Sequence, residues 1–231
     1  MNTTTGQRPY RQRARARAAD ERTERIMRAA DELFREVPFE QLTLAAVAER
    51  AGVGLQTLIR RVGTKDGLVR AAMQHGAPQL QRFRGQIPPP DPERVAAIVC
   101  EQYEQMGETI DRMIRQEDSS PALKEAVAAG RASHADWVQR TFAPVLAERP
   151  ADDRKGLRAR LIAVTGVEVY LVIRRDCGLD PDHARRAVTA LLADTLAGAS
   201  RSAGVRAGGS SYAPDTGDGS EQPARQADSA S

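Results

Sequence analysis

The chain has 231 residues, of which 41% are hydrophobic and 4% aromatic, and its formal net charge is +3. This is enough material for one or two domains with a sizeable core, and the scarcity of aromatic residues and β-branched runs favours an all-α protein. No apolar run reaches the length of a membrane span. Two cysteines, Cys100 and Cys177, in a chain without a signal peptide indicate a reducing cytoplasm rather than a disulfide framework.

The charge is unevenly distributed along the chain. Residues 1–87 hold 16 Lys/Arg against 9 Asp/Glu, a charge of +7, which leaves −4 for residues 88–231. A positive field on one half of a protein is typical of nucleic-acid binding. Residues 1–19 are polar and carry five arginines without an acid, so we expect a disordered basic arm there. Either this arm reaches phosphates or the minor groove, or it is a solvated tail that only raises non-specific affinity.

Three helices are expected in the next part of the chain. The first covers about residues 20–36 and carries an apolar stripe. Thr43 then caps a short helix, because its hydroxyl can accept a hydrogen bond from a backbone N–H one turn further on. Apolar residues recur at helical spacing after it, and Gly52 permits the left-handed conformation that ends a helix. A second short helix follows over about residues 55–62.

Two short helices joined by a glycine turn predict a helix-turn-helix, whose second helix enters the DNA major groove. The alternative is a helical corner of a larger core. The stretch RIMRAADELFREVPFEQLTLAAVAERAGV, with a T-L pair and a K-x-x-L entry into a fourth helix, resembles the DNA-binding domain of TetR-family transcriptional regulators over residues 22–75. The resemblance implies an all-α fold: an N-terminal three-helix helix-turn-helix DNA-binding domain and a C-terminal helical ligand-binding and dimerisation domain. It also implies a homodimer on a palindromic double-stranded DNA operator, most often as a repressor.

The expected DNA contacts gather on the second helix of the motif. Gln56 can bond bidentately to adenine and Leu55 can pack on a thymine methyl group, whereas the basic residues that follow suit phosphates. The family often has Tyr and His where this chain has Ile59 and Arg61. Either Arg60 or Arg61 supplies the lost backbone contact, or Ile59 makes an apolar contact instead. The full expected set is Thr43, Leu55, Gln56, Thr57, Ile59, Arg60, Arg61 and Lys65.

A proline run at residues 87–92 divides the chain, because proline lacks the backbone N–H and restricts the residue before it. The regulatory helices are expected with internal breaks near Gly107 and Pro144. They cover about residues 91–115, 121–143, 152–177 and 181–198. The expected division is a disordered basic arm at 1–19, a DNA-binding domain with its connector helix at 20–87, a helical regulatory and dimerisation domain at 88–198, and a disordered tail at 199–231.

The regulatory domain is expected to bind a small-molecule effector in a mostly apolar cavity. Inward spacing supplies candidate lining residues, each of them equally compatible with ordinary core. Two of them, His134 and Glu168, are either polar groups of that cavity, or residues exposed at its rim or satisfied in a hydrogen-bond network. The candidates are Tyr103, Met106, Ile110, Met113, His134, Trp137, Glu168 and Tyr170. In the alternative function, the C-terminal domain of a DNA-bound regulator docks a protein partner rather than a small molecule.

The run from Leu161 to Ile173 is apolar nearly all round, so it must be buried on more than one face. Pairing it with residues 182–197 across a two-fold axis predicts a four-helix dimer interface. Its expected residues are Leu161, Leu171, Val188, Leu191 and Leu192.

Catalytic, metal and cofactor motifs are not found at the required spacing. A thiol triad of Cys100, His134 and Asp136 would lack the strand-turn-helix elbow and the oxyanion loop that such chemistry needs. The few histidines and cysteines lie far apart in the sequence, which argues against zinc. We therefore expect no enzymatic activity, no metal and no cofactor. The expected partners are DNA, a second copy of the chain and an unidentified effector, in the cytoplasm and not at a membrane.

Overall fold

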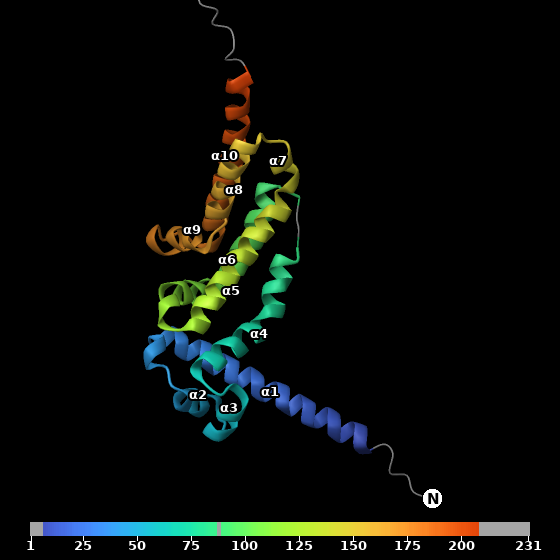
Figure 1. Ribbon diagram of the computed structural model, residues 1–231, viewed down its shortest axis with the longest axis vertical. Coiled ribbons are helices and arrows are strands. Elements are labelled where there is room, and N and C mark those ends of the chain that lie inside the picture. Colours follow the sequence, from blue (N-terminus) through green and yellow to red (C-terminus); the bar gives the residue numbers. More distant parts are fainter. Residues whose placement is uncertain (1–6, 87–88, 208–231) are drawn as a thin grey trace, which may run out of the picture.

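The structure is a computed structural model that describes residues 7–86 and 89–207. Within these residues it consists of helices and contains no strand, which confirms the all-α class. Figure 1 shows an elongated molecule with α1 to α3 at one end and α8 and α10 at the other. The helices of the N-terminal domain are α1 (Gln7–Glu36), η1 (Phe39–Gln41), α2 (Leu44–Ala51), α3 (Leu55–Val62) and α4 (Lys65–Arg84). Those of the C-terminal domain are α5 (Pro92–Arg115), η2 (Glu117–Ser119), α6 (Pro121–Thr141), α7 (Ala143–Ala147), α8 (Ala151–Val164), α9 (Val167–Leu171), η3 (Val172–Asp176, a π-helical turn) and α10 (Pro181–Ala207).

The N-terminal domain is built around one apolar core. Ile26 of α1, Val47 of α2 and Leu58 of α3 are each fully buried in it. Leu123, near the start of α6, is buried in the same cluster, so the C-terminal domain closes one side of this core. The two domains therefore pack against each other as well as being joined by α4.

Helix α1 begins at Gln7, which corrects the expectation of a disordered arm at residues 1–19. Residues 7–19 continue α1, while residues 1–6 lie outside the described part of the chain. The physical reason is composition: arginine and alanine are both strong helix formers, and Pro9 falls in the first turn, where a missing N–H is tolerated. Figure 1 shows this part of α1 projecting beyond the bundle at the end that carries α2 and α3.

The C-terminal domain packs its helices around α5. Helix α10 lies against α5 and α8, and α9 crosses α5 at Gly107. A Cβ at Gly107 would lie 3.6 Å from Leu171 and 3.8 Å from Val167, so the glycine is a packing position. It does not break α5, contrary to our expectation. The break expected near Pro144 is found, because α6 ends at Thr141 and α7 begins at Ala143.

The single helix expected over residues 152–177 is instead three segments, α8, α9 and η3. Helix α8 ends at Val164, and α9 begins after Gly166. Thr165 lies at the break, fully buried, and its side chain is hydrogen-bonded to α6. These tertiary bonds outweigh the local preference for a continuous helix.

Most residues expected at the dimer interface lie in the core of the chain itself. Leu161, Val188 and Leu192 are 0% exposed and Leu171 is 9% exposed, all inside the core of the chain itself. Only Leu191, which is 41% exposed, is open to a partner. The apolar stripes are buried as expected, but within the chain: α10 packs against α5 and α8, and α8 packs against α6 and α10. The expected tail at 199–231 also begins later, since α10 continues to Ala207; residues 208–231 lie outside the described part of the chain.

Candidate DNA interface and effector site

Helices α2 and α3 form a tight helix-turn-helix. The Thr43 hydroxyl caps α2 by accepting a bond from the Ala46 N–H at 3.1 Å. Gly52 ends α2 with φ 63° and ψ 40°, a left-handed conformation that a residue with a side chain rarely adopts. Helix α3 then spans Leu55–Val62, the range expected from the sequence. The turn therefore holds α3 across α2 at a defined angle.

The outer face of α3 presents polar and apolar side chains together. Leu55 and Ile59 are 39% and 37% exposed, and they are two of the four large apolar side chains exposed in the described residues. Gln56 and Arg60 are also exposed on α3, and Thr57 is half-buried. Because α3 anchors itself in the core through Leu58, its outer side chains are free to meet a duplex. This arrangement suits base edges and thymine methyl groups in a major groove.

The basic residues on and after α3 differ in how many hydrogen bonds they make within the protein. Arg61 donates to the Thr23 hydroxyl of α1 at 2.5 Å. Lys65 donates to the carbonyls of Phe39 and Glu40 at 2.8 and 3.1 Å, and lies 4.6 Å from the centre of the Phe39 ring. Lys65 thus holds the α1–α2 connection, which sequence reasoning missed, and one of its three N–H groups remains for a phosphate. No bond to Arg60 is found within the described residues, so Arg60 is the freest candidate for a backbone contact.

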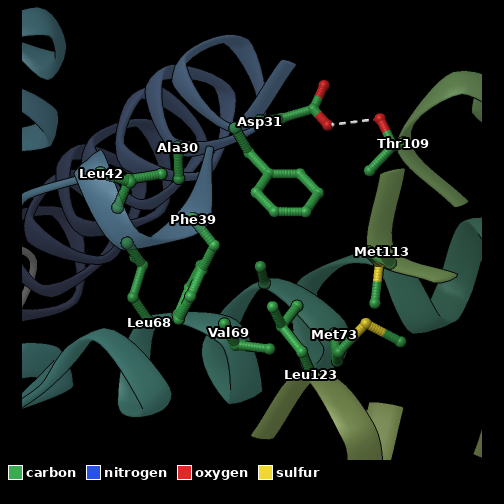
Figure 2. Close-up of a pocket in the computed structure, with 12 residues that line it drawn as sticks. Ala30, Asp31, Phe39, Leu42, Leu68, Val69, Met73, Thr109, Met113 and Leu123 are labelled. Carbon is green, nitrogen blue, oxygen red and sulfur yellow. Dashed lines mark hydrogen bonds between the residues drawn. The ribbon is translucent and has the colours of Figure 1, made fainter. Parts of the chain in front are cut away.

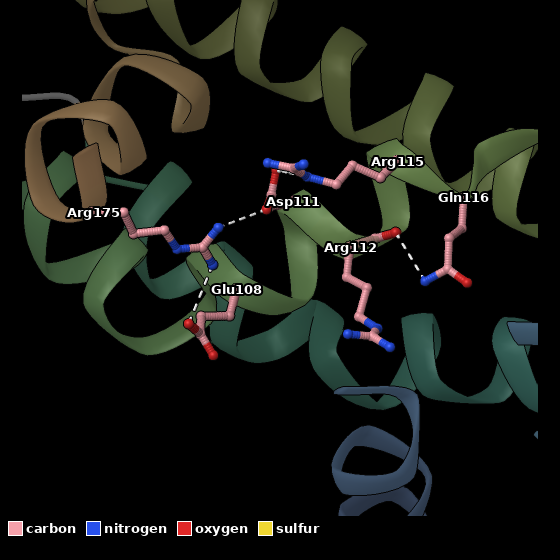
Figure 3. A network of polar contacts seen from close by, with 6 residues as sticks. All are labelled: Glu108, Asp111, Arg112, Arg115, Gln116 and Arg175. Carbon is pink, nitrogen blue, oxygen red and sulfur yellow. Dashed lines mark hydrogen bonds and ion pairs between the residues drawn. The ribbon is translucent and has the colours of Figure 1, made fainter. Parts of the chain in front are cut away.

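The two domains are joined by hydrogen bonds as well as by the apolar core. Gln116, which follows α5, accepts from the Phe39 N–H at 2.6 Å. The Gln116 side chain also donates to the Arg112 carbonyl of α5 at 3.5 Å (Figure 3). Ser120 at the start of α6 donates to Asp66 in the first turn of α4 at 2.8 Å. A movement of α5 or α6 would therefore be transmitted to the residues around α3.

An apolar pocket of about 90 Å³ lies at the same junction (Figure 2). Phe34 and Phe39 line it from the N-terminal domain, Met73 from α4, and Met113 and Leu123 from the C-terminal domain. At its edge the Thr109 hydroxyl of α5 donates to Asp31 of α1 at 2.7 Å. Of the expected effector residues only Met113 lines this pocket.

The other expected effector residues lie elsewhere. Glu168 is exposed, so its expected place in a cavity is not supported. Tyr170 is buried against Tyr103, with ring centres 5.7 Å apart, and its hydroxyl donates to Glu104. Met106 and Ile110 are half-buried on α5. Tyr103, His134 and Trp137, by contrast, come together around a residue that was not expected, Arg84.

A chain of hydrogen bonds runs from the end of α4 to the break between α8 and α9. Arg84 Nη2 donates to the Tyr103 hydroxyl at 3.3 Å, and this hydroxyl donates to the Thr165 carbonyl at 3.0 Å. The Thr165 hydroxyl lies 3.1 Å from His134 Nε2, which is also 3.2 Å from the Ile162 carbonyl. Since that carbonyl can only accept, we assign the imidazole proton to Nε2 and leave Nδ1 as an acceptor.

The protonation states of this cluster follow from burial. Burial and, to a smaller extent, the positive charge of Arg84 lower the pKa of His134 to about 4. Burial likewise raises the pKa of the Tyr103 hydroxyl, against the opposing effect of Arg84. At neutral pH the cluster therefore contains one charge, the Arg84 guanidinium, among neutral groups.

A second polar group secures η3 to α5 at the surface. Arg175 pairs with Asp111 at 2.8 Å and with Glu108 at 3.2 Å, and Arg115 pairs with Asp111 at 3.0 Å (Figure 3). Arg174 pairs with Glu104 at 2.6 Å, and this arginine holds the pKa of the Glu104 carboxyl below its usual range. The exposed arginines of η3 thus have carboxylate partners, whereas the buried Arg84 has none in these contacts.

The Cys100 thiol, considered above as a nucleophile, is not activated. Cys100 is buried in the core, and this burial raises its pKa to about 12. Asp136, the third member of the triad considered, is exposed and pairs with Arg140 at 2.8 Å. Within residues 7–86 and 89–207 there is no cluster of three or more His, Cys, Asp or Glu residues suited to a metal ion. No helix in this described part is long and apolar enough to cross a membrane.

Residues 26–72 match the sequence profile described as "Bacterial regulatory proteins, tetR family", which covers α2, α3 and the adjoining parts of α1 and α4. Residues 26–72 therefore form a TetR-type helix-turn-helix domain. This match confirms the resemblance to the TetR family that the sequence shows in this region. No sequence among the curated proteins matches the chain.

Among solved structures, the chain resembles a SmeT–triclosan complex with a TM-score of 0.55 and 18% identity, over 77% of this chain and 90% of that one. At this identity the likeness supports the TetR-type fold alone. A TetR regulator from Rhodococcus sp. RHA1 (TM-score 0.35, 20% identity, 76% and 94% covered) and one from Streptomyces coelicolor A3 (0.34, 21%, 76% and 96%) also match.

Sequence reasoning missed Arg84, although one signal for it exists. Arg84 follows Leu80 by four residues and Phe83 by one, so it continues the inward stripe of α4. An arginine at a helix C-terminus is also favoured by the helix dipole, so its position alone does not indicate a buried charge.

Proposed function

We propose that this TetR-family regulator is a homodimeric repressor that binds a palindromic operator and is released by a small-molecule effector. The observation that carries the proposal is the outer face of α3, where Leu55, Gln56, Ile59 and Arg60 are exposed together on a helix fixed by the core. A cytoplasmic location follows from a DNA target.

The dimer is proposed to form through the outer faces of α8 and α10. On α8 the exposed residues Gly156, Ala159 and Ala163 recur at three and four residues. On α10 the exposed residues Ala190 and Ala197 lie two turns apart on one face, and the exposed Leu191 lies beside Ala190. Small side chains let helices approach closely, so two copies of this helix pair can pack as a four-helix bundle. This replaces the interface expected from the sequence, of which Leu191 alone is retained.

Release by an effector is supported by the contacts between the domains. Helix α4 runs unbroken from the residues beside α3 to Arg84, and the Gln116 and Ser120 bonds tie the C-terminal domain to the N-terminal one. A related fold has been solved with triclosan bound, so a small molecule is a reasonable effector class for this chain. DNA and effector must then weaken each other equally.

The alternative, a C-terminal domain that docks a protein partner, is favoured by one observation. The junction pocket of about 90 Å³ is well below the ~300–1,000 Å³ of drug-size sites. An effector of that size would have to displace side chains there, whereas a protein partner would not. The two functions differ in whether a small molecule alone changes operator affinity.

The first test is sequencing of genomic DNA fragments retained by the purified protein at near-physiological salt. We expect enrichment of an inverted repeat whose half-sites lie about one helical turn apart or a multiple of it. Uniform retention that disappears as salt rises would instead leave a protein that coats DNA, and the operator proposal would fail.

Binding to the same DNA then distinguishes residues that contact bases from residues that contact phosphates. Gln56→Ala should relax base preference in each half-site by about 1–3 kcal/mol, whereas Arg60→Ala should weaken all sequences alike and lower the salt dependence. Both residues are exposed on α3, so neither change should alter stability. Identical behaviour of the two variants would contradict this division of roles.

A further inference from the structure

Arg84 is a buried charge without an opposite charge. Its side chain is 5% exposed, and Nη1 has no hydrogen-bond partner. Nη2 donates to the neutral Tyr103 hydroxyl, and the guanidinium carbon lies 4.9 Å from the centre of the Trp137 ring. Among the ion pairs of the described residues, none includes Arg84. A guanidinium stays protonated in proteins, and buried charges are normally paired, so this position lacks an anion.

The neighbouring helix α6 carries two more buried polar atoms without partners. They are His134 Nδ1 and Thr141 Oγ1, and Gln102 Oε1 on α5 is a third. His134, Trp137 and Thr141 are spaced by three and four residues, so they share one face of α6. Trp137 lies with its ring stacked near that of His134, at 6.3 Å between centres, and donates to the Gln86 carbonyl at 2.9 Å. The unmet hydrogen-bonding groups therefore lie beside an indole plane.

We propose that Arg84, with His134 and Trp137 beside it, forms the anion-binding end of the effector site, and that the effector is a small organic carboxylate. This inference rests on the proposed function, because it names the effector class of that function. A carboxylate matches the guanidinium in charge and in its planar, two-point geometry. His134 Nδ1 is an acceptor, so an acid that also carries a hydroxyl or N–H donor satisfies a second unmet group.

The position of Arg84 explains how such a ligand acts on DNA binding. Arg84 is the last residue of α4, whose first residue, Lys65, holds the loop at Phe39. The same guanidinium contacts Tyr103, whose hydroxyl bonds to Thr165 at the break between α8 and α9. A carboxylate that takes over the Arg84 donors changes what the end of α4 is bonded to. The ligand therefore acts directly on the helix that connects the two domains.

The test uses Trp137, the one tryptophan of the 231-residue chain, as the reporter. Full-length protein is titrated with acetate, lactate, benzoate and 4-hydroxybenzoate, with 4-hydroxybenzamide as the uncharged counterpart and chloride as the inorganic anion. We expect a saturable change in Trp137 fluorescence and a rise in Tm with at least one acid, strongest where a donor is present, and neither with the amide. Arg84→Met should weaken this response at least tenfold, and Arg84→Lys should weaken it less. Arg82→Met, which removes an exposed arginine from the same helix, should leave it unchanged.

Three results would overturn the proposal. One is an acid response that Arg84→Met retains; another is equal stabilisation by chloride, which would indicate an adventitious ion only. The third is the absence of a saturable response to every acid in the wild-type protein, a result that does not depend on the variant folding. Operator binding is measured in parallel without any acid. If it persists while the acids fail, the effector class is wrong and the regulator function stands; if operator binding is itself absent, the proposed function fails.

Discussion

The cores of the two domains differ in the polarity of their buried side chains. In the N-terminal domain, the cluster around Ile26, Val47 and Leu58 is entirely apolar. The buried polar and charged side chains of the described residues all occur from the last residue of α4 onwards: Arg84, Gln102, Ser120, Thr141 and Thr165. An apolar core responds little to pH or to ions, whereas a core with hydrogen-bonding groups changes its stability when those groups gain or lose a proton or a partner. The stability of the N-terminal core should therefore depend little on pH or bound ions, whereas the stability of the C-terminal core should depend on both.

The largest expected effect tests the apolar core of the N-terminal domain. Leu58→Ala removes a fully buried side chain of α3 and should lower the free energy of unfolding by about 3 kcal/mol. Ile59→Ala, one residue further along the same helix but 37% exposed, should change it by less than about 0.5 kcal/mol. Urea unfolding followed by circular dichroism measures both. Comparable losses in the two variants would mean that α3 is packed differently from the structure described here.

The second prediction tests whether the stability of the C-terminal core depends on pH. The pKa of His134 is lowered to about 4 from a model-peptide value near 6.5, so the folded protein holds this imidazole neutral while the unfolded chain protonates it. Stability is therefore lost as pH falls from 6.5 towards 4, by about 2 kcal/mol at pH 5 relative to neutral pH. The measurement is urea unfolding at pH 7.5 and pH 5 for wild type and for His134→Gln, which keeps an N–H donor. A pH effect of the same size in both proteins would assign the loss to other groups.

The smallest effect compares the exposed apolar side chains of the two domains. Leu191→Glu places a charge in the proposed interface of α8 and α10 and should weaken the dimer at least tenfold, which is about 1.4 kcal/mol. Ile59→Glu should leave the dimer intact and abolish operator binding. Sedimentation measures the oligomeric state of both variants, and a DNA-binding assay measures their affinity for the operator. A Leu191→Glu protein that stays dimeric at low concentration would move the interface away from α10.

The sequence predicts the N-terminal domain closely because its determinants are local. Thr43 caps α2, Gly52 ends it, and α3 has the expected bounds. Each of these features depends on residues only a few positions apart, and the spacing of the apolar residues indicates which face of each helix is buried. The same local rules failed at the N-terminus of α1, where charge was taken as a sign of disorder although arginine is a good helix former.

The C-terminal domain is predicted less well because its determinants are distant in sequence. The break at Thr165 depends on contacts with Tyr103 and His134, 62 and 31 residues away. Apolar spacing showed that the stripes of α8 and α10 are buried, but it cannot distinguish burial within the chain from burial against a second copy. The expected effector residues Tyr103, His134 and Trp137 do meet, yet they meet around Arg84, a charged residue that was not among the candidates.

Helix α4 has a proline in its interior, Pro78, about two turns before Arg84. A proline lacks the N–H that the carbonyl of Gln74 would otherwise bind, so the helix is easier to bend there than elsewhere. The part of α4 from Lys65 to Pro78 is ~20 Å long, so a bend of ~10° at Pro78 would shift the Lys65 end by about 3–4 Å. In a dimer that shift would occur once in each copy and would change the distance between the two α3 helices relative to the helical repeat of the duplex.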